Sequence, residues 1–313
     1  MPLSLSINTI ADPDGHQPAL RLKGDGLVIA LSDGAAVGFG EASHSGDDHA
    51  CENRINQLFK EYIHDFHFDL PAIRALEIGI FSHTDDFVTA TAISALNQAL
   101  YDLLATQQGI PLWKLFSASP KRKTLPFYAT INRALRSRTP SDYLRVCRSV
   151  RDHHISAIKC APFEKVIPGM PPSEQVAAAQ TGLSILNAIH DHFPECSMRV
   201  DFHNRFHLSA FLEILPRLED LDLVWIEEPC MHPQDFSTIR SATRIPLAAG
   251  ELFFGTEEFI RLMDGQLVDV IMPDIKHVGG TGPLIAVCRE AEKRGVGVSP
   301  HNPSGPVACL AAL

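Results

Sequence analysis

The sequence predicts an α/β protein, with an α+β domain over residues 1–125 followed by a (β/α) barrel over residues 126–313. Two observations predict this. The first part combines a hairpin pattern with two helical patterns, whereas short apolar runs alternate with helical segments from Pro126 onward. A spacing of roughly 25 residues between such runs is typical of βα units and a parallel sheet. With 45% hydrophobic and 20% charged residues, the composition excludes disordered, collagen-like and coiled-coil chains.

The elements of the first domain follow from local patterns. Residues 26–42 alternate apolar and small side chains around Asp33-Gly34, a turn pair, and therefore predict a β-hairpin. Residues 51–63 and 89–109 place apolar side chains at helical spacing, and Gly109 is expected to end the second helix. A hairpin followed by helices indicates a small α+β domain.

The second domain contains seven apolar runs, most of which end in a polar or charged residue. The predicted strands are 127–132, 156–163, 198–203, 222–228, 246–251, 269–274 and 296–301. The predicted helices between them include 173–190, 206–219 and 281–295. In a parallel barrel the C-terminal strand ends share one face, where active sites form. No glycine-rich GxGxxG motif follows an early strand, which argues against a dinucleotide-binding domain.

Three carboxylates end three consecutive predicted strands: Asp201, Glu227 and Glu251. Three like charges in one pocket of low dielectric are costly unless a cation neutralises them. A set of oxygen ligands favours Mg²⁺ over zinc or copper. The spacing therefore makes these three residues candidate magnesium ligands. The alternative is that each carboxylate caps an ordinary helix in a βα loop.

His301 ends the seventh run and is the candidate general base. A histidine acts well as a base when a partner fixes its tautomer, and Asp274, one strand earlier, is placed for that role. The alternative is a surface histidine with an aspartate that caps a helix.

The chain resembles the enolase superfamily, specifically its mandelate racemase subgroup, over residues 26–313. The matching segments are GFGEA, ALNQALYDLLATQQGIPLWKLF, AIKCAPF, VDFHNRF, WIEEP, AAGE, MPDIKHVGG and SPHNPSGP. The resemblance implies a capping domain and a modified TIM barrel. It also implies that Asp201, Glu227 and Glu251 bind Mg²⁺, with His301 and Asp274 as the catalytic dyad. The reactions of this family begin with removal of the proton α to a carboxylate, and the metal stabilises the resulting enediolate.

Departures from the family pattern narrow the expected chemistry. The racemases carry Lys-x-Lys on the second strand, and here the second lysine position is Ala161, whereas Lys159 remains to hold the substrate carboxylate or the metal-bound oxygens. Racemisation needs a base on each face, whereas elimination needs one base and one acid. His203, two residues after Asp201, is the candidate acid, because similar DxH pairs occur in sugar-acid dehydratases and period-two alternation would place both side chains on one side of the strand. The alternative for His203 is a structural or solvent-facing histidine.

Asn132 and Arg133 end the first barrel run and are candidate ligands of the substrate's hydroxyls or carboxylate. A structural loop salt bridge is the alternative role for this pair. The subgroup that includes muconate cycloisomerases carries a lysine five residues before a Gly-Gly pair, and that position here is Asp274. Lys276 is out of phase to replace that lysine, so this subgroup is disfavoured.

The predicted function is thus Mg²⁺-dependent α-proton abstraction followed by β-elimination of water, as in an aldonate or aldarate dehydratase. The barrel domain is shorter than the lower limit of about 200 residues for this fold, so the eighth strand and the C-terminal return to the capping domain are expected to be missing. Two alternatives stay open. One is a truncated and catalytically impaired remnant, and the other is a racemase or epimerase with an unrecognised second base.

Charge and cysteine content define the expected surroundings and partners. The net charge of −10, with scattered lysines and arginines, argues against a nucleic-acid partner, and no apolar run is long enough to span a bilayer. Seven cysteines without a CxxC pair and an N-terminus without a signal-peptide pattern predict free thiols in a cytoplasmic protein. The expected partner is a small carboxylate substrate, and a homo-oligomer is one possible assembly. We expect loops near residues 10–25 and 43–50 to set the substrate's stereochemistry.

Overall fold

The computed structural model describes residues 2–10, 26–43, 46–79, 84, 86–120, 122–230 and 232–313. Most of the loop at residues 10–25 lies outside these ranges. The chain forms two compact units. The first unit contains Met1–Lys123, Gly250–Met263 and Ile271–Leu313, and the second contains Thr124–Ala249 and Asp264–Val270. The boundary between residues 125 and 126 was predicted from the order of the elements along the chain. It stays a prediction.

The first unit contains a three-stranded antiparallel sheet in the order β1-β2-β3. The predicted hairpin is confirmed as β2 (Gly26–Ser32) and β3 (Val37–Glu41), joined by a turn in which Asp33 Oδ1 accepts the amide hydrogens of Ala35 and Ala36. The sequence patterns did not predict β1 (Ser4–Ile10), which pairs along its full length with β2.

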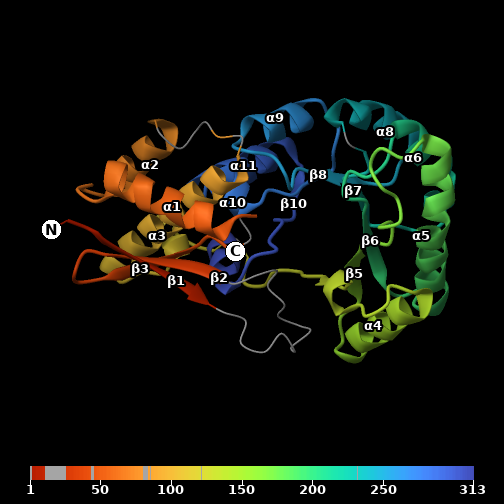
Figure 1. The fold of residues 1–313 in the computed structure, drawn as a ribbon, viewed down its shortest axis with the longest axis horizontal. Coiled ribbons are helices and arrows are strands. Elements are labelled where there is room, and N and C mark those ends of the chain that lie inside the picture. Colours follow the sequence, from red (N-terminus) through yellow and green to blue (C-terminus); the bar gives the residue numbers. More distant parts are fainter. Residues whose placement is uncertain are drawn as a thin grey trace. The chain divides into compact units, whose positions relative to one another are not determined.

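Helix α3 (Phe87–Gln107) packs directly on this sheet, as Figure 1 shows. Gly38 and Gly40 on β3 allow the close approach, because a Cβ atom at either position would collide with the α3 backbone near Ala95 or Ala99. The glycines of the GFGE pattern thus set the distance between helix and sheet.

The predicted end of α3 is confirmed. Gly109 has a φ of 63° and follows the last helical turn, and the amide of Ile110 donates to the carbonyl of Ala105.

The other helices at the N-terminal end complete the core of the first unit. The predicted helix 51–63 begins earlier, as α1 (Asp48–Leu58), and ends in a π-helical turn, η1 (Phe59–Ile63). Helix α2 (Leu70–Gly79) was not predicted. The apolar faces of these helices and of α3 bury a cluster with the inner side of the sheet, including Ile29, Leu31, Ile55, Ile63, Leu96 and Leu100.

Seven strands form a parallel sheet in chain order, from β10 at one edge to β4 at the other. Each predicted run overlaps one of them, although the strands are shorter than the runs. Their bounds are β4 (Ala129–Thr130), β5 (Ala157–Cys160), β6 (Ser197–Asp201), β7 (Trp225–Glu227), β8 (Leu247–Ala249), β9 (Val270–Ile271) and β10 (Gly297–Val298). The described residues add no eighth strand to this sheet. Asp201 and Glu227 are the last residues of β6 and β7, whereas Glu251, Asp274 and His301 lie in the segments that follow β8, β9 and β10.

Helices connect consecutive strands, as predicted for βα units, and one more helix follows the last strand β10. Their bounds are α4 (Pro140–Asp152), α5 (Pro172–His192), α6 (Leu208–Ile214), α7 (Pro216–Glu219), α8 (Phe236–Ala242), α9 (Glu257–Asp264), α10 (Ile275–Val278), α11 (Thr281–Arg294) and α12 (Pro306–Ala312). The single helix predicted over 206–219 is wrong, since it is divided into α6 and α7. Pro216 has no amide hydrogen to continue the ladder of α6, which explains the break.

Two further observations concern the whole described part of the chain. None of its helices combines the length and apolar character needed to cross a membrane. All seven cysteines are present there as free thiols.

Candidate active site

Lys159, Asp201 and Glu227 form a buried charged group at the C-terminal ends of β5, β6 and β7. Asp201 pairs in register with Glu227, so both side chains leave neighbouring strands at the same level. The Lys159 ammonium lies 3.3 Å from Asp201 Oδ2 and donates a hydrogen bond to Glu227 Oε1. The three residues are 6%, 2% and 0% exposed. One buried ammonium group is therefore shared by two buried carboxylates.

The electrostatics of this group indicate a deficit of positive charge. Burial lowers the pKa of Lys159, but the charges of Asp201 and Glu227 outweigh burial and hold that pKa above its ordinary value. Burial also raises the pKa of Asp201, but hydrogen bonding to His203 and the charge of Lys159 bring it below its ordinary value. Burial and the neighbouring Asp201 raise the pKa of Glu227 to about 7. A single lysine thus leaves the second carboxylate poorly neutralised.

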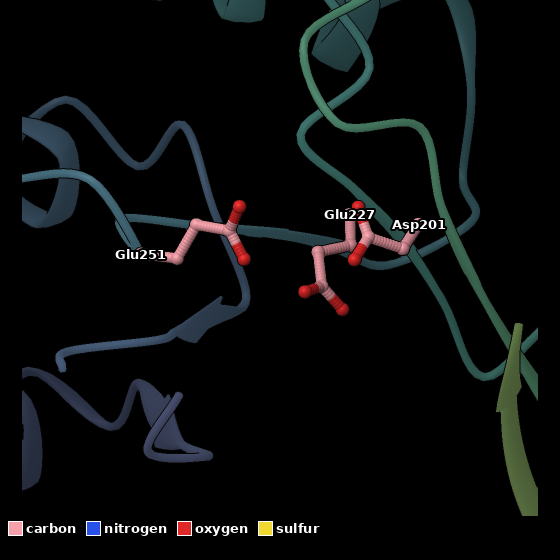
Figure 2. Close-up of side chains that lie close together, drawn as sticks. All are labelled: Asp201, Glu227 and Glu251. Atoms are coloured by element: carbon pink, nitrogen blue, oxygen red, sulfur yellow. The ribbon is translucent and has the colours of Figure 1, made fainter. Parts of the chain in front are cut away.

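Glu251 supplies a third buried carboxylate, two residues after the end of β8. One oxygen each from Asp201, Glu227 and Glu251 lie within 4.8 Å of one another, and Figure 2 shows the three carboxylates close together. Among the described residues this is the one group of acidic, histidine or cysteine side chains that could hold a metal ion. Three oxygen donors and an excess of buried negative charge fit a hard divalent cation.

His203 contacts Asp201, although not for the predicted reason. Strand β6 ends at Asp201, and His203 has a φ of 50°, so alternation along a strand does not orient this side chain. Instead, the His203 amide donates to Asp201 Oδ1 at 2.9 Å in an Asx turn, and His203 Nε2 lies 3.0 Å from Asp201 Oδ2. The predicted alternation is therefore wrong, whereas the proximity of the two residues is found.

A group of phenylalanines supports this turn. Phe202, fully buried between Asp201 and His203, stacks on Phe163 at 4.6 Å and meets Phe206 and Phe211 edge to face. Aromatic pairs in these geometries contribute about 0.5–1.5 kcal/mol beyond the burial of their area. The packing of Phe202 fixes the backbone that places Asp201 and His203.

His301 and Asp274 form a hydrogen-bonded pair in the segments that follow β10 and β9. His301 Nδ1 lies 2.8 Å from Asp274 Oδ2, and the His301 amide donates to the carbonyl of Pro273. Asp274 also caps α10, since its Oδ1 accepts the amide hydrogen of Lys276 at 2.8 Å. The strand-end aspartate is therefore both a helix cap and a histidine partner, which the sequence analysis treated as alternatives.

The surroundings of Asp274 keep it ionised. Its burial raises its pKa, but hydrogen bonding to His301 and the charges of Lys276 and His277 hold that pKa below the ordinary value. The Lys276 ammonium lies 3.9 Å from Asp274 Oδ2. His301 Nε2 lies 3.3 Å from Glu251 Oε2, so the histidine stands between two carboxylates.

The remaining predicted residues occupy the end of the first barrel run. Asn132 and Arg133 belong to a 3-10 turn directly after β4. Asn132 Oδ1 accepts the amide hydrogen of Ala161 at 2.9 Å, and this bond ties the turn to the end of β5. Arg133 is exposed. The structure thus shows a structural contact for Asn132, and the substrate-binding role of the pair stays a prediction.

Two residues near the site were missed by sequence reasoning. The indole Nε1–H of Trp225 donates to Glu227 Oε2 at 3.1 Å, and Lys276 is a buried cation beside Asp274. The alternation of Trp225 with Glu227 on one short strand was the available signal for the first. Lys276 gave no signal, because its burial depends on packing in the folded chain.

Two family models match the sequence. Residues 142–313 match the enolase C-terminal domain-like family, and residues 25–117 match the N-terminal domain of mandelate racemase and muconate lactonizing enzymes. The chain belongs to the enolase superfamily. The predicted resemblance is therefore confirmed.

Relatives of known name support the same conclusion. A D-gluconate dehydratase from Thermoproteus tenax is 30% identical over 223 residues, which are 71% of this chain and 44% of that protein. A D-galactonate dehydratase from Verminephrobacter eiseniae is 27% identical over 228 residues, which are 72% of this chain and 58% of that protein. The chain thus spans about half the length of these two relatives.

Solved structures show the same fold. A mandelate racemase/muconate lactonizing enzyme from Sulfitobacter superposes with a TM-score of 0.85 at 18% sequence identity, covering 98% of this chain and 80% of that one. The predicted combination of a capping domain with a seven-stranded part of a parallel barrel is confirmed.

Proposed function

We propose that this protein is a Mg²⁺-dependent dehydratase of a sugar acid, an aldonate or aldarate. The observation that carries the proposal is the buried triad of Asp201, Glu227 and Glu251, in which one oxygen from each side chain is close to the other two. The names of the two curated relatives, both sugar-acid dehydratases, support the substrate class and the reaction type.

Asp201, Glu227 and Glu251 would hold the magnesium ion. When bound, the ion supplies the positive charge that makes a proton α to a carboxylate acidic enough to remove. Lys159, which contacts two of the three carboxylates, adds a fixed positive charge and is suited to bind the substrate carboxylate. The excess of negative charge in the group favours a cation over a neutral occupant.

His301 removes the α-proton in this proposal. Its Nδ1 faces the Asp274 carboxylate, which accepts a hydrogen bond, so the proton of the neutral imidazole belongs on Nδ1 and Nε2 is the basic nitrogen. Asp274 also stabilises the imidazolium that forms when the proton is taken up. This arrangement performs the first step of an elimination with one base.

His203 protonates the departing β-hydroxyl. It contacts Asp201, one of the proposed ligands, through Nε2, so it lies beside the place where the substrate would bind. Asn132 and Arg133 would bind hydroxyl or carboxylate groups of the sugar acid. Since the second lysine position of the racemases is Ala161, a base for the opposite face is lacking there, and this favours elimination over racemisation.

The direct test is turnover of a library of aldonates and aldarates in the presence of Mg²⁺, followed by detection of 2-keto-3-deoxy acids. We expect one stereochemical class to be dehydrated, and a Glu251→Gln variant to be inactive on it. Exchange of the α-proton with solvent deuterium without any keto product would contradict the dehydratase proposal and indicate an epimerase. Absence of both reactions would contradict the catalytic role as a whole.

A further inference from the structure

Trp225 makes a side-chain contact to Glu227 that the proposed mechanism does not use. Glu227 is fully buried, and both of its carboxylate oxygens are engaged by side chains, Oε1 by the Lys159 ammonium and Oε2 by the Trp225 indole. The indole nitrogen is a donor only and stays protonated at every relevant pH. It therefore holds the carboxylate in one orientation without adding or removing charge.

The indole itself contacts two neighbouring side chains, Arg199 and Tyr128. The guanidinium of Arg199 lies over the Trp225 ring at 4.8 Å from its centroid and over the Tyr128 ring at 5.2 Å. The two rings meet edge to face at 5.7 Å. Arg199 is anchored in turn by Nη1, which donates to the carbonyl of Ser197 at 3.1 Å. A cation on the face of an indole is attracted by the negative face of the ring, and more strongly where water is excluded.

The strand register explains why these groups meet. Lys159 pairs with Arg199 and Arg199 pairs with Trp225, so the three side chains form one row across β5, β6 and β7. Asp201 and Glu227 form the next row toward the C-terminal ends of the strands. The aromatic and cationic row thus lies directly beneath two of the three carboxylates.

We propose that Trp225 is a positioning residue for the metal site, and that its indole N–H orients Glu227 for a divalent cation. Hydrogen bonds to carboxylate ligands restrict their rotation, and losing such a partner typically weakens metal affinity by about 10–100-fold. Trp225 touches neither substrate nor metal in this role. The proposal rests on the metal site of the proposed function, but it concerns binding and does not depend on which reaction follows.

Replacement of Trp225 by Phe removes the N–H donor and keeps an aromatic ring for Arg199 and Tyr128. We expect Trp225→Phe to bind Mg²⁺ about 10–100-fold more weakly in calorimetric titrations. The melting temperature of the metal-free protein should change little. Trp113→Phe is the matched control, because Trp113 is the only other tryptophan and is 39% exposed on a different element. Wild-type affinity in Trp225→Phe would overturn the proposal.

A second measurement keeps the native Trp225. In the Trp113→Phe background Trp225 is the sole tryptophan, so its fluorescence should change saturably as Mg²⁺ binds. The change should disappear when Glu227 is also replaced by Gln. Calorimetric Mg²⁺ binding without any change in emission would argue against a contact between the indole and a metal ligand.

The outcomes separate this proposal from the proposed function. Weakened Mg²⁺ binding by Trp225→Phe in a protein that converts no sugar acid would support the positioning role and reject the dehydratase. Unchanged Mg²⁺ binding by Trp225→Phe, together with dehydration of a sugar acid by the wild-type protein, would reject the positioning role and support the dehydratase. A wild-type protein that binds no divalent cation would reject both.

Discussion

Asp274 Oδ2 lies 2.8 Å from His301 Nδ1 and 3.9 Å from the ammonium of Lys276, so one carboxylate oxygen is shared by an imidazole and a buried lysine. The three side chains come from segments that follow β9 and β10. The arrangement fixes the orientation of His301 from the Nδ1 side, while Nε2 faces Glu251 Oε2 at 3.3 Å.

Replacing His301 by Asn should abolish exchange of the α-proton of a sugar acid in D₂O while Mg²⁺ binding persists. Loss of a positioned general base lowers the rate by about 10²–10⁴-fold. Exchange is followed by NMR, and metal binding by calorimetry. His154→Asn, at an exposed position after α4, should exchange like wild type. Undiminished exchange in His301→Asn would require a different base.

Glu251→Gln should lose most of the stabilisation that Mg²⁺ gives the wild-type protein. A ligand at a concentration of about 100 times its Kd stabilises the folded state by about 2.7 kcal/mol, and a weaker site gains less at the same concentration. Thermal melts with and without Mg²⁺ measure the difference. Glu258→Gln, an exposed position on α9, should retain the full shift. A full shift in Glu251→Gln would remove this residue from the ligand set.

His203→Asn should separate the two steps of the proposed elimination. Asn tolerates the positive φ of this position, so the turn should keep its form. The variant should still exchange the α-proton through His301 but release keto product about 10²–10⁴-fold more slowly. Unchanged product formation would leave His301 as both base and acid. Loss of both activities would indicate damage to the metal site through Asp201.

Asp142 should make the stability of the protein depend on pH. Burial raises its pKa, but backbone amides of Ser137, Arg136 and Arg138 and the guanidinium of Arg145 outweigh burial and lower it below its ordinary value. A depressed folded-state pKa stabilises the fold above the unfolded pKa of about 3.9, and this contribution is lost as the pH falls toward the folded value.

The difference in unfolding free energy between wild type and Asp142→Asn should therefore be constant near neutral pH and shrink below about pH 4. Denaturant unfolding at a series of pH values measures it. Asp152→Asn, an exposed position on the same helix, is the control and should show little difference. A difference for Asp142→Asn that does not depend on pH would contradict the assigned contacts.

Gly40→Ala should destabilise the first unit, because the added Cβ atom would collide with the backbone of Ala95 on α3. Overpacking of this kind costs about 1–3 kcal/mol. Gly79→Ala, where a Cβ atom would meet no neighbour, is the matched control and should be close to neutral. Equal melting temperatures of the two variants would show that the helix can move away from the sheet.

Much of the fold could be predicted because its signals are local. The hairpin over 26–42, the end of α3 at Gly109 and the seven parallel strands all follow from periodicity and turn residues. Strand β1 was missed because all of its side chains are at least partly exposed and residues 11–25 separate it from its pairing partner β2. Helix α6 ends at Ile214, and Pro216 was a sequence signal for this break that the prediction of one helix over 206–219 did not use.

The candidate site was predictable to a similar extent. Strand-end positions indicated Asp201, Glu227, Glu251, Asp274 and His301, and the structure places the first three together and pairs the last two. The contact of His203 with Asp201 was predicted for the wrong reason, since an Asx turn and not strand alternation creates it. The roles of these residues in catalysis stay predictions.

By itself, the sequence determined the order of the strands and helices and the chemical types of the side chains at the strand ends. Both are properties of short segments, because periodicity and strand position act over a few residues. Only the tertiary structure decided which charges share one environment: that Lys159 lies between Asp201 and Glu227, that Trp225 donates to Glu227, and that Lys276 is buried beside Asp274. The physical reason is that burial and charge interactions depend on residues brought together by folding, and the strength of each interaction is set by the water that the surrounding side chains exclude.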